Sequence, residues 1–216
     1  MKNFIFIFVD MLVLSRHTIP LSFASFRLFL SPGLLKCNHS ALLSTTAITT
    51  DLQGEKTKAI RFDDLNLHPQ LLEAIHNQGI RRLTEIQSKT YDLIRNEHNL
   101  VARSRTGTGK TMAFLVPLLQ RQLVREQQYN ANEILSPSNN INNPGIPILV
   151  LSPTRELAVQ IHQEAERLLS ICDRKIKLTA QVLYGGGSSK KEDIQKFQKK
   201  LPTVLVATPG RLKDHL

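Results

Sequence analysis

The 216-residue chain contains only two cysteines, Cys37 and Cys172. Two isolated cysteines give neither a metal-ligand spacing nor a disulfide framework, which excludes a small disulfide-rich scaffold and a cysteine-based zinc module. A reducing compartment fits this usage. The hydrophobic share of 41% and the charged share of 21% are ordinary for a globular protein. The length allows one α/β domain and a tail.

A long apolar run is also missing. Residues 4–14 are apolar but are interrupted by Asp10, and a membrane-spanning helix needs about 20 apolar residues. The first fifty residues carry eleven serines and threonines and no glutamate. Basic, serine-rich and acid-poor segments are typical of organelle transit peptides. We therefore predict that residues 1–54 are a disordered extension with a mitochondrial transit peptide. A secretory signal and a non-native start remain open alternatives.

Acidic side chains are scarce relative to basic ones. The chain has 28 Lys and Arg against 18 Asp and Glu, a formal net charge of +10. Residues 1–54 hold four basic and two acidic side chains, so residues 55–216 hold the other 24 and 16, a surplus of eight. A basic domain suggests a polyanionic partner, nucleic acid first, although a merely soluble basic surface remains open.

The most informative stretch is Ser104–Thr111, with the sequence SRTGTGKT. The short run 98–102 before it, which ends in the apolar residues 100–102, is predicted to form a buried strand, and residues 112–123 after it a helix. A glycine-bearing loop that joins a strand to a helix and ends in Gly-Lys-Thr is the context of a phosphate-binding loop. The general pattern has glycine where Ser104 stands. A glycine-rich surface turn is the alternative interpretation.

The residue types of this loop suit a triphosphate. Gly107 and Gly109 can adopt positive φ, so that successive backbone N–H groups converge on an anion. Lys110 would reach the β- and γ-phosphates, and the Thr111 hydroxyl would ligate Mg²⁺. We therefore predict Lys110 and Thr111 as catalytic residues and Thr111 as the metal ligand. The loop residues predicted to bind nucleotide are Arg105, Thr106, Gly107, Thr108, Gly109, Lys110 and Thr111.

Strand and helix patterns alternate along the rest of the chain. This alternation predicts a parallel, doubly wound sheet with ligand-binding loops at the carboxyl ends of its strands. The polar residues 129–147 are rich in Asn, Pro and Gly and are predicted to form a long surface loop. The predicted helices begin at Pro69 and Thr84 and cover 155–169 and 190–200, and the predicted strands cover 148–151, 178–183 and 203–207.

Further stretches, taken with the loop, resemble motifs of the DEAD-box RNA helicases. Residues 79–87, with Phe62 upstream, look like that family's Q motif, although the family usually has proline where Leu83 stands. The resemblance implies that Gln87 recognises adenine and that Phe62 packs against the base. A glutamine amide can donate to N7 and accept from the N6 amine of adenine. ATP is therefore the predicted nucleotide, with Mg²⁺.

Three motifs imply an RNA-binding surface. Residues 153–158 resemble motif Ia, residues 208–211 resemble motif Ib, and Gly185-Gly186 resembles the GG element. Hydroxyls, N–H groups and guanidinium suit phosphate, and none of these motifs presents a base-reading surface, so RNA binding should be sequence-tolerant and salt-sensitive. The implied RNA-binding residues are Pro153, Thr154, Arg155, Glu156, Gly185, Gly186, Thr208, Pro209, Gly210 and Arg211.

The resemblance implies a RecA-like P-loop NTPase domain over residues 55–216, incomplete at its C-terminus, because the family's Asp-Glu-Ala-Asp strand would follow Leu216. We expect an ATP-dependent RNA helicase whose present fragment hydrolyses almost no ATP by itself. The loop region looks most similar to the family's mitochondrial branch, with cytoplasm or nucleus as alternatives. Two other functions stay open: a non-catalytic ATP- and RNA-binding module, and a different P-loop protein without adenine preference.

Overall fold

The computed structural model describes residues 4–8, 11–15, 46–49, 60–135, 145–171 and 178–215. Cys37, Cys172 and residues 136–144 of the predicted surface loop lie outside the described residues.

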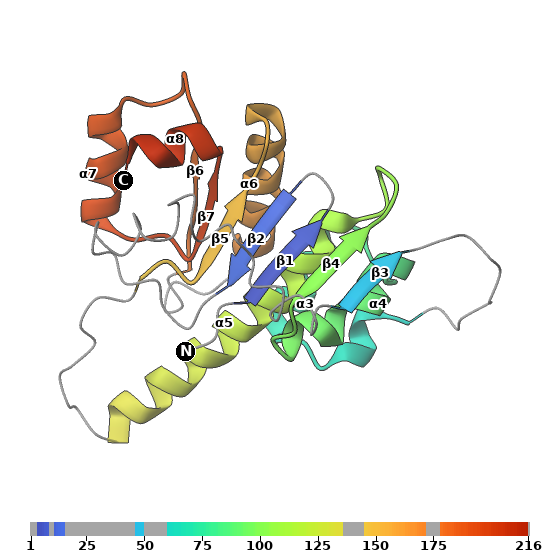
Figure 1. Cartoon of the computed structure of the whole chain (residues 1–216). Coiled ribbons are helices and arrows are strands. Elements are labelled where there is room, and N and C mark those ends of the chain that lie inside the picture. Colours follow the sequence, from blue (N-terminus) through green and yellow to red (C-terminus); the bar gives the residue numbers. More distant parts are fainter. Residues whose placement is uncertain are drawn as a thin grey trace.

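The described strands form one sheet in the order β3-β4-β1-β2-β5-β7-β6 (Figure 1). Neighbouring strands are parallel except where β2 is involved, because β2 is antiparallel to both β1 and β5. Strands β4, β5, β6 and β7 therefore run in one direction, and the loops that follow them emerge at one edge. The strands are β1 Phe4–Phe8, β2 Met11–Ser15, β3 Thr46–Thr49, β4 Leu100–Arg103, β5 Ile148–Leu151, β6 Ala180–Leu183 and β7 Val204–Ala207.

The helices begin and end largely where local signals predict. Helix α3 has Pro69 in its first turn, and Gly79 just after it has a φ of 75°, the positive φ that glycine tolerates at a helix end. Helix α4 begins at Glu85, one residue after the predicted start, and Thr84 is its N-cap residue. The bounds are η1 Phe62–Leu65, α3 Pro69–Asn77, α4 Glu85–Arg95, α5 Lys110–Leu135, α6 Arg155–Leu169, α7 Lys190–Lys199 and α8 Pro209–Asp214.

Helix α5 is longer than predicted, and this corrects the start of the surface loop. The sequence pattern assigned residues 129–147 to a loop, but α5 continues to Leu135. The stretch that follows Arg125 contains Glu, Gln, Ala and Leu, which have high helix propensity, and no glycine or proline before Pro137. The asparagines in this stretch are weaker helix formers, but none of them breaks a helix as proline does.

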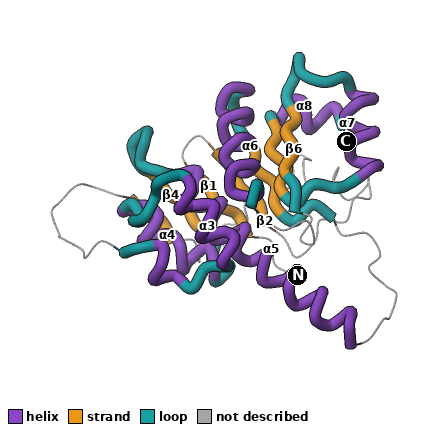
Figure 2. Tube along the Cα trace, turned by 180° about the vertical axis from the view of Figure 1, so that it is seen from behind, coloured by secondary structure: helices purple, strands orange, loops and turns teal. Residues whose placement is uncertain are grey.

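Side chains alternate between the two faces of the sheet, as strand geometry requires. Ile148 and Val150 of β5 belong to a large core with α3, α4, α5 and α6, whereas Leu149 belongs to a smaller core with Leu212 of α8 and Phe197 of α7. Seen from behind, α3, α5 and α6 lie in front of the strands (Figure 2). The molecule therefore has helices on both faces, in agreement with the predicted α/β architecture.

The three N-terminal strands were not expected, because residues 1–54 were predicted to be an extension outside the fold. Strand β1 pairs with β4 and β2 pairs with β5, so the β1–β2 pair fills the space between β4 and β5. Residues 4–8 and 11–15 are rich in Phe, Ile, Val and Leu, which suit strands. Their backbone also supplies partners to strand edges that would otherwise be open. The boundary at residue 54 itself stays a prediction.

Candidate functional site

The loop between β4 and α5 has the backbone geometry of an anion-binding turn. Gly107 and Gly109 have φ values of 77° and 82°, and residues other than glycine rarely adopt such positive values. The hydroxyls of Ser104 and Thr108 lie 2.8 Å apart across the loop. Thr108 Oγ1 also donates to the carbonyl oxygen of Arg105 at 2.9 Å. Ser104, the departure from the general pattern, therefore closes the loop through its side chain.

Lys110 lies at the start of α5 and reaches back over the loop. Its Nζ donates to the carbonyl oxygen of Ser104 at 2.7 Å and to that of Arg105 at 3.2 Å. Arg105, Thr106 and Gly107 are exposed at the tip of the loop. The loop thus combines an ammonium group, exposed backbone and the N-terminus of a long helix, which together fit a polyphosphate. Thr111 follows in the first turn of α5 and is half-buried.

Gln87 ties helix α4 to this loop. Its side chain is buried, its Oε1 accepts a hydrogen bond from the backbone N–H of Thr84 at 2.9 Å, and its Nε2 donates to the carbonyl oxygen of Gly109 at 3.1 Å. Both ends of the amide that was predicted to recognise adenine are therefore engaged within the protein. A purine contact would have to replace one of these bonds, or use the second hydrogen of Nε2 or the second lone pair of Oε1.

Phe62 does not lie at the surface of the site. Its ring is 1% exposed and belongs to the large core, on the short helix η1. In this position Phe62 packs inside the core and offers no free ring face to a base.

The predicted RNA-binding motifs meet in one groove at the carboxyl ends of β5, β6 and β7. The groove has a volume of about 550 Å³. Its lining residues are Pro153, Thr154, Arg155, Glu156, Gly185, Thr208, Gly210, Arg211 and Asp214. The structure thus brings together residues from all three motifs that are separate in the sequence. Gly186 and Pro209 are adjacent but do not line it, and Asp214 is a lining residue that the motifs did not indicate.

Arg155 lies over the two predicted glycines. A Cβ on Gly186 would stand 3.0 Å from Arg155 Nη1, and one on Gly185 would stand 3.5 Å from Nη2. The close approach that glycine permits here is therefore to the guanidinium of Arg155. Arg155 is exposed and has no hydrogen-bond or ion-pair partner among the residues that the structure describes.

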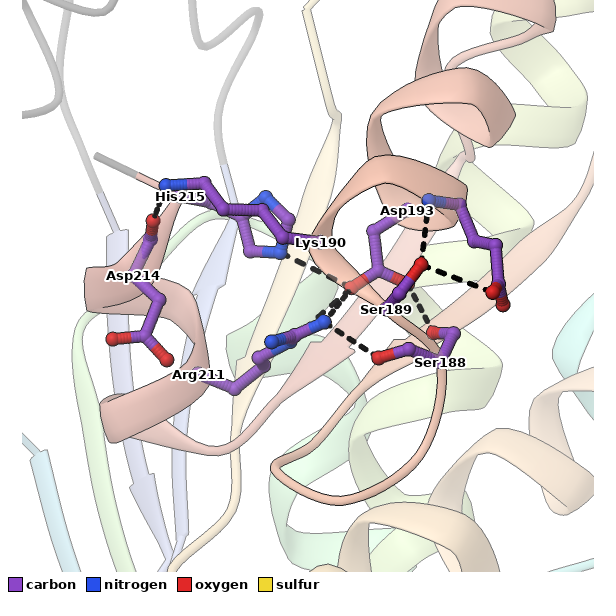
Figure 3. Close-up of polar contacts among 8 residues, drawn as sticks. Ser188, Ser189, Lys190, Asp193, Arg211, Asp214 and His215 are labelled. Atoms are coloured by element: carbon purple, nitrogen blue, oxygen red, sulfur yellow. Dashed lines mark hydrogen bonds and ion pairs between the residues drawn. The ribbon is translucent and has the colours of Figure 1, made fainter.

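Arg211 has a different environment, which the sequence motifs did not reveal (Figure 3). Its Nε and Nη2 donate to Oδ2 of Asp193 at 3.2 and 2.7 Å, and Nη2 also donates to the carbonyl oxygen of Ser188 at 2.7 Å. Asp193, on α7, is 1% exposed. Ser188 Oγ and His215 Nε2 complete the partners of its carboxylate. The contact joins residues 18 positions apart on two helices, so no local spacing could have indicated it.

The electrostatics of this cluster favour an ionised Asp193. Burial raises the pKa of the Asp193 carboxyl, but hydrogen bonds from Ser188, Arg211 and His215 and the positive charge of Arg211 outweigh burial and hold the pKa below 3.8. His215 is itself kept in place by the ring of Phe197, which it meets edge to face with ring centroids 6.3 Å apart. The carboxylate is therefore a fixed negative charge directly behind the groove wall.

The described residues contain no group of three or more His, Cys, Asp and Glu side chains that could hold a metal ion. They also contain no helix that is both long and apolar enough to cross a membrane.

Comparison with known proteins gives a consistent result. The family model described as DEAD/DEAH box helicase matches residues 84–216. The chain is 37% identical over 163 residues to the mitochondrial ATP-dependent RNA helicase MSS116 of Eremothecium gossypii, covering 75% of this chain and 22% of that protein. It is 36% identical over 169 residues to DEAD-box ATP-dependent RNA helicase 25 of Oryza sativa subsp. japonica, covering 76% and 26%. The chain therefore spans about a quarter of the length of these relatives.

The fold also matches a solved structure. The structure of Mss116p, with its NTE and C-tail deleted and bound to ssRNA and AMP-PNP, has a TM-score of 0.61 and 28% sequence identity to this chain. The match covers 79% of this chain and 32% of the solved chain.

Proposed function

The chain belongs to the DEAD/DEAH box helicase family, and from this we propose that it is the ATP-binding and RNA-binding part of an ATP-dependent RNA helicase. The observation that carries the proposal is the groove at the carboxyl ends of β5, β6 and β7, which gathers residues of the three RNA motifs. The phosphate loop follows β4, whose carboxyl end faces the same edge of the sheet. Two sites at one edge would allow nucleotide and RNA to influence each other through the sheet and its loops.

For the nucleotide, we propose that the loop residues 105–111 hold the triphosphate. Lys110 would exchange its bonds to the loop carbonyls for bonds to phosphate oxygens, which are stronger acceptors because they are charged. Thr111 would supply one hydroxyl ligand to Mg²⁺, and phosphate and water would supply the others, as is usual for this ion. The Mg²⁺-bound triphosphate provides the reactive phosphoryl group, and this chain's contribution is to bind and orient it.

For RNA, we propose that the groove binds the sugar–phosphate backbone of one strand. Arg155 supplies positive charge, and Thr154 and Thr208 supply hydroxyls. Thr208 makes no capping hydrogen bond with its side chain, so its hydroxyl can serve a ligand. Two carboxylates, Glu156 and Asp214, share the lining, so a phosphate would be held at Arg155 and kept away from them. Such contacts read no bases and give binding without sequence preference.

Two binding measurements on the full chain test this function. A fluorescent ATP analogue should bind, ATP should displace it better than GTP, and Lys110→Ala should weaken its binding at least tenfold. Lys89→Ala is the matched control, because Lys89 is an exposed lysine on α4 that forms an ion pair with Glu85. Labelled single-stranded RNA should bind more weakly as salt rises. Absence of both binding activities in a folded chain would overturn the proposal, and equal affinity for GTP would favour a different P-loop function.

A measurement of phosphate release distinguishes an ATP-hydrolysing helicase from a non-catalytic module that binds ATP and RNA. If the chain binds ATP and RNA but releases no phosphate, it is a non-catalytic module by itself. RNA-stimulated phosphate release by the chain would contradict our expectation that hydrolysis needs groups beyond this chain.

For localisation, we propose the mitochondrion, on the basis of the basic, acid-poor N-terminal composition and of one relative named as mitochondrial. Cytoplasm and nucleus are the alternatives. If import removed residues 1–54, strands β1, β2 and β3 would leave the sheet with them. A fusion of residues 1–50 to a fluorescent reporter tests the proposal, and a diffuse cytosolic or nuclear signal would overturn it.

A further inference from the structure

We propose that Asp193 withholds the charge of Arg211 from the groove, so that Arg155 is the guanidinium that binds an RNA phosphate there. The inference deepens the proposed RNA-binding function and rests on it. It assigns Asp193 and Arg211 as positioning residues of the groove wall, and it changes the role that the motif resemblance implied for Arg211.

The contacts of the two arginines differ. Three of the five guanidinium hydrogens of Arg211 are used by Asp193 and by the Ser188 carbonyl. Its side chain is 12% exposed, and the carboxylate it faces is 1% exposed. Arg155 is exposed, and among the described residues nothing neutralises it. A phosphate that enters the groove therefore meets one unpaired cation and one cation that already has its counter-charge.

The Asp193–Arg211 pair connects segments that are distant in the sequence. Asp193 lies in the first turn of α7, Arg211 lies in α8, and Ser188 lies in the loop that follows the glycines. The Asp193 carboxylate therefore joins α7 to α8 and to the loop after β6 (Figure 3). The loop and α8 contribute Gly185 and Arg211 to the lining of the groove. A second link, from Lys190 Nζ to the carbonyl oxygen of Asp214, connects the same two helices. Fixing these segments also fixes the positions of Gly185 and Gly210, which both line the groove.

The Asp193–Arg211 ion pair is maintained because separating its members is unfavourable in free energy. A buried carboxylate that loses its cation partner becomes an uncompensated charge in a low-dielectric environment. To bind a phosphate through Nε and Nη2, Arg211 would have to leave Asp193. Replacing the carboxylate by a phosphate would contribute little net free energy to RNA binding. Binding at Arg155 requires no such exchange.

The salt dependence of RNA binding distinguishes the two arginines. Each phosphate neutralised on a single strand contributes about 0.7 to the slope of log affinity against log salt concentration. A cation already paired within the protein releases no counterions from RNA. We therefore expect Arg155→Gln to flatten the slope by about 0.7, and Asp193→Asn to steepen it by up to about 0.7 because the Arg211 charge is uncovered. The double variant Asp193→Asn, Arg211→Gln should keep the wild-type slope.

The experiment is a salt titration of labelled single-stranded RNA binding to the full chain, read by fluorescence anisotropy. Lys213→Gln is the matched control, because it removes an exposed positive charge from α8 that does not line the groove, and its slope should equal that of the wild type. Circular dichroism spectra and melting curves establish that each variant is folded. The double variant keeps the test valid if Asp193→Asn alone is too unstable, since it removes both members of the pair together.

Two slope results would overturn the inference. If the double variant flattens the slope as much as Arg155→Gln does, Arg211 binds a phosphate directly. If Asp193→Asn is folded and its slope does not steepen, Asp193 does not mask the charge. If the wild-type chain binds no RNA at any salt concentration, the proposed function is wrong and the inference falls with it.

Discussion

Gln87 Nε2 donates a hydrogen bond to the carbonyl oxygen of Gly109 at 3.1 Å. This bond joins helix α4 to the loop between β4 and α5, and the other end of the same amide accepts the N–H of Thr84 at the start of α4. The geometry of the loop therefore depends on a side chain 22 residues before it.

Replacing Gln87 by alanine should loosen the loop and lower stability together. The change removes one helix cap and one of the two hydrogen bonds to the Gly109 carbonyl, which keeps only the bond from the Ala113 N–H. We therefore expect a loss of about 1–2 kcal/mol in the free energy of unfolding. Binding of a fluorescent ATP analogue should weaken as well. Urea unfolding and nucleotide titration measure the two effects. Lys89→Ala, an exposed change on the same helix, should shift the free energy of unfolding by less than about 0.5 kcal/mol.

Alanine at Gly109 should be more harmful than alanine at Gly107. Both glycines have positive φ, so both changes strain the backbone by about 1–2 kcal/mol. A Cβ at Gly109 would also lie 2.5 Å from Gln87 Nε2, whereas a Cβ at Gly107 would meet no atom within 4 Å. Thermal unfolding of the two variants should therefore give a clearly lower melting temperature for Gly109→Ala. Equal melting temperatures would show that Gln87 moves aside without loss.

Stability should fall as the pH decreases from 7 toward 5. Burial lowers the pKa of His162 below 6.5, and the Glu166 carboxylate opposes this shift only in part. Burial also lowers the pKa of His68. The unfolded chain therefore binds protons at a higher pH than the native chain does, and this favours unfolding below pH 6.5.

Urea unfolding across this pH range tests the effect, and His162→Gln should flatten the dependence. A stability that stays constant or rises as the pH falls would contradict the assignment of these two imidazoles as neutral in the native state.

Strand β2 should contribute to the stability of the sheet. Its residue Val13 pairs with Val150 of β5. Val13→Pro removes a backbone N–H and should weaken the strand, whereas Val13→Thr keeps both the N–H and a β-branched side chain. We expect a lower melting temperature for the proline variant only, together with aggregation because the edges of β1 and β5 become open. If deletion of residues 1–54 leaves the melting temperature unchanged, these strands do not stabilise the domain.

Local patterns in the sequence were sufficient for most elements. Helix α6 has the predicted bounds, and the turn at Gly107 and Gly109 has the predicted positive φ, because both features depend on residues that are neighbours in the chain. At residues 129–135 the polar composition predicted a loop, but the structure has a helix there, because this stretch contains no helix-breaking residue. The family motifs also identified the groove, since eight of its lining residues were predicted to bind RNA.

The sequence by itself determined the glycine-bearing loop 104–111, the alternation of strands and helices, and the three motifs at the strand ends. Each of these features depends on a short contiguous run of residues. Only the tertiary structure decided that Arg211 is paired with Asp193, that Gln87 is bonded to Gly109, and that β1 and β2 separate β4 from β5. These relationships join segments that are distant in the chain. They depend on how helices and strands pack and on which groups hydrogen-bond with buried charges and amides. Local sequence spacing does not predict these contacts.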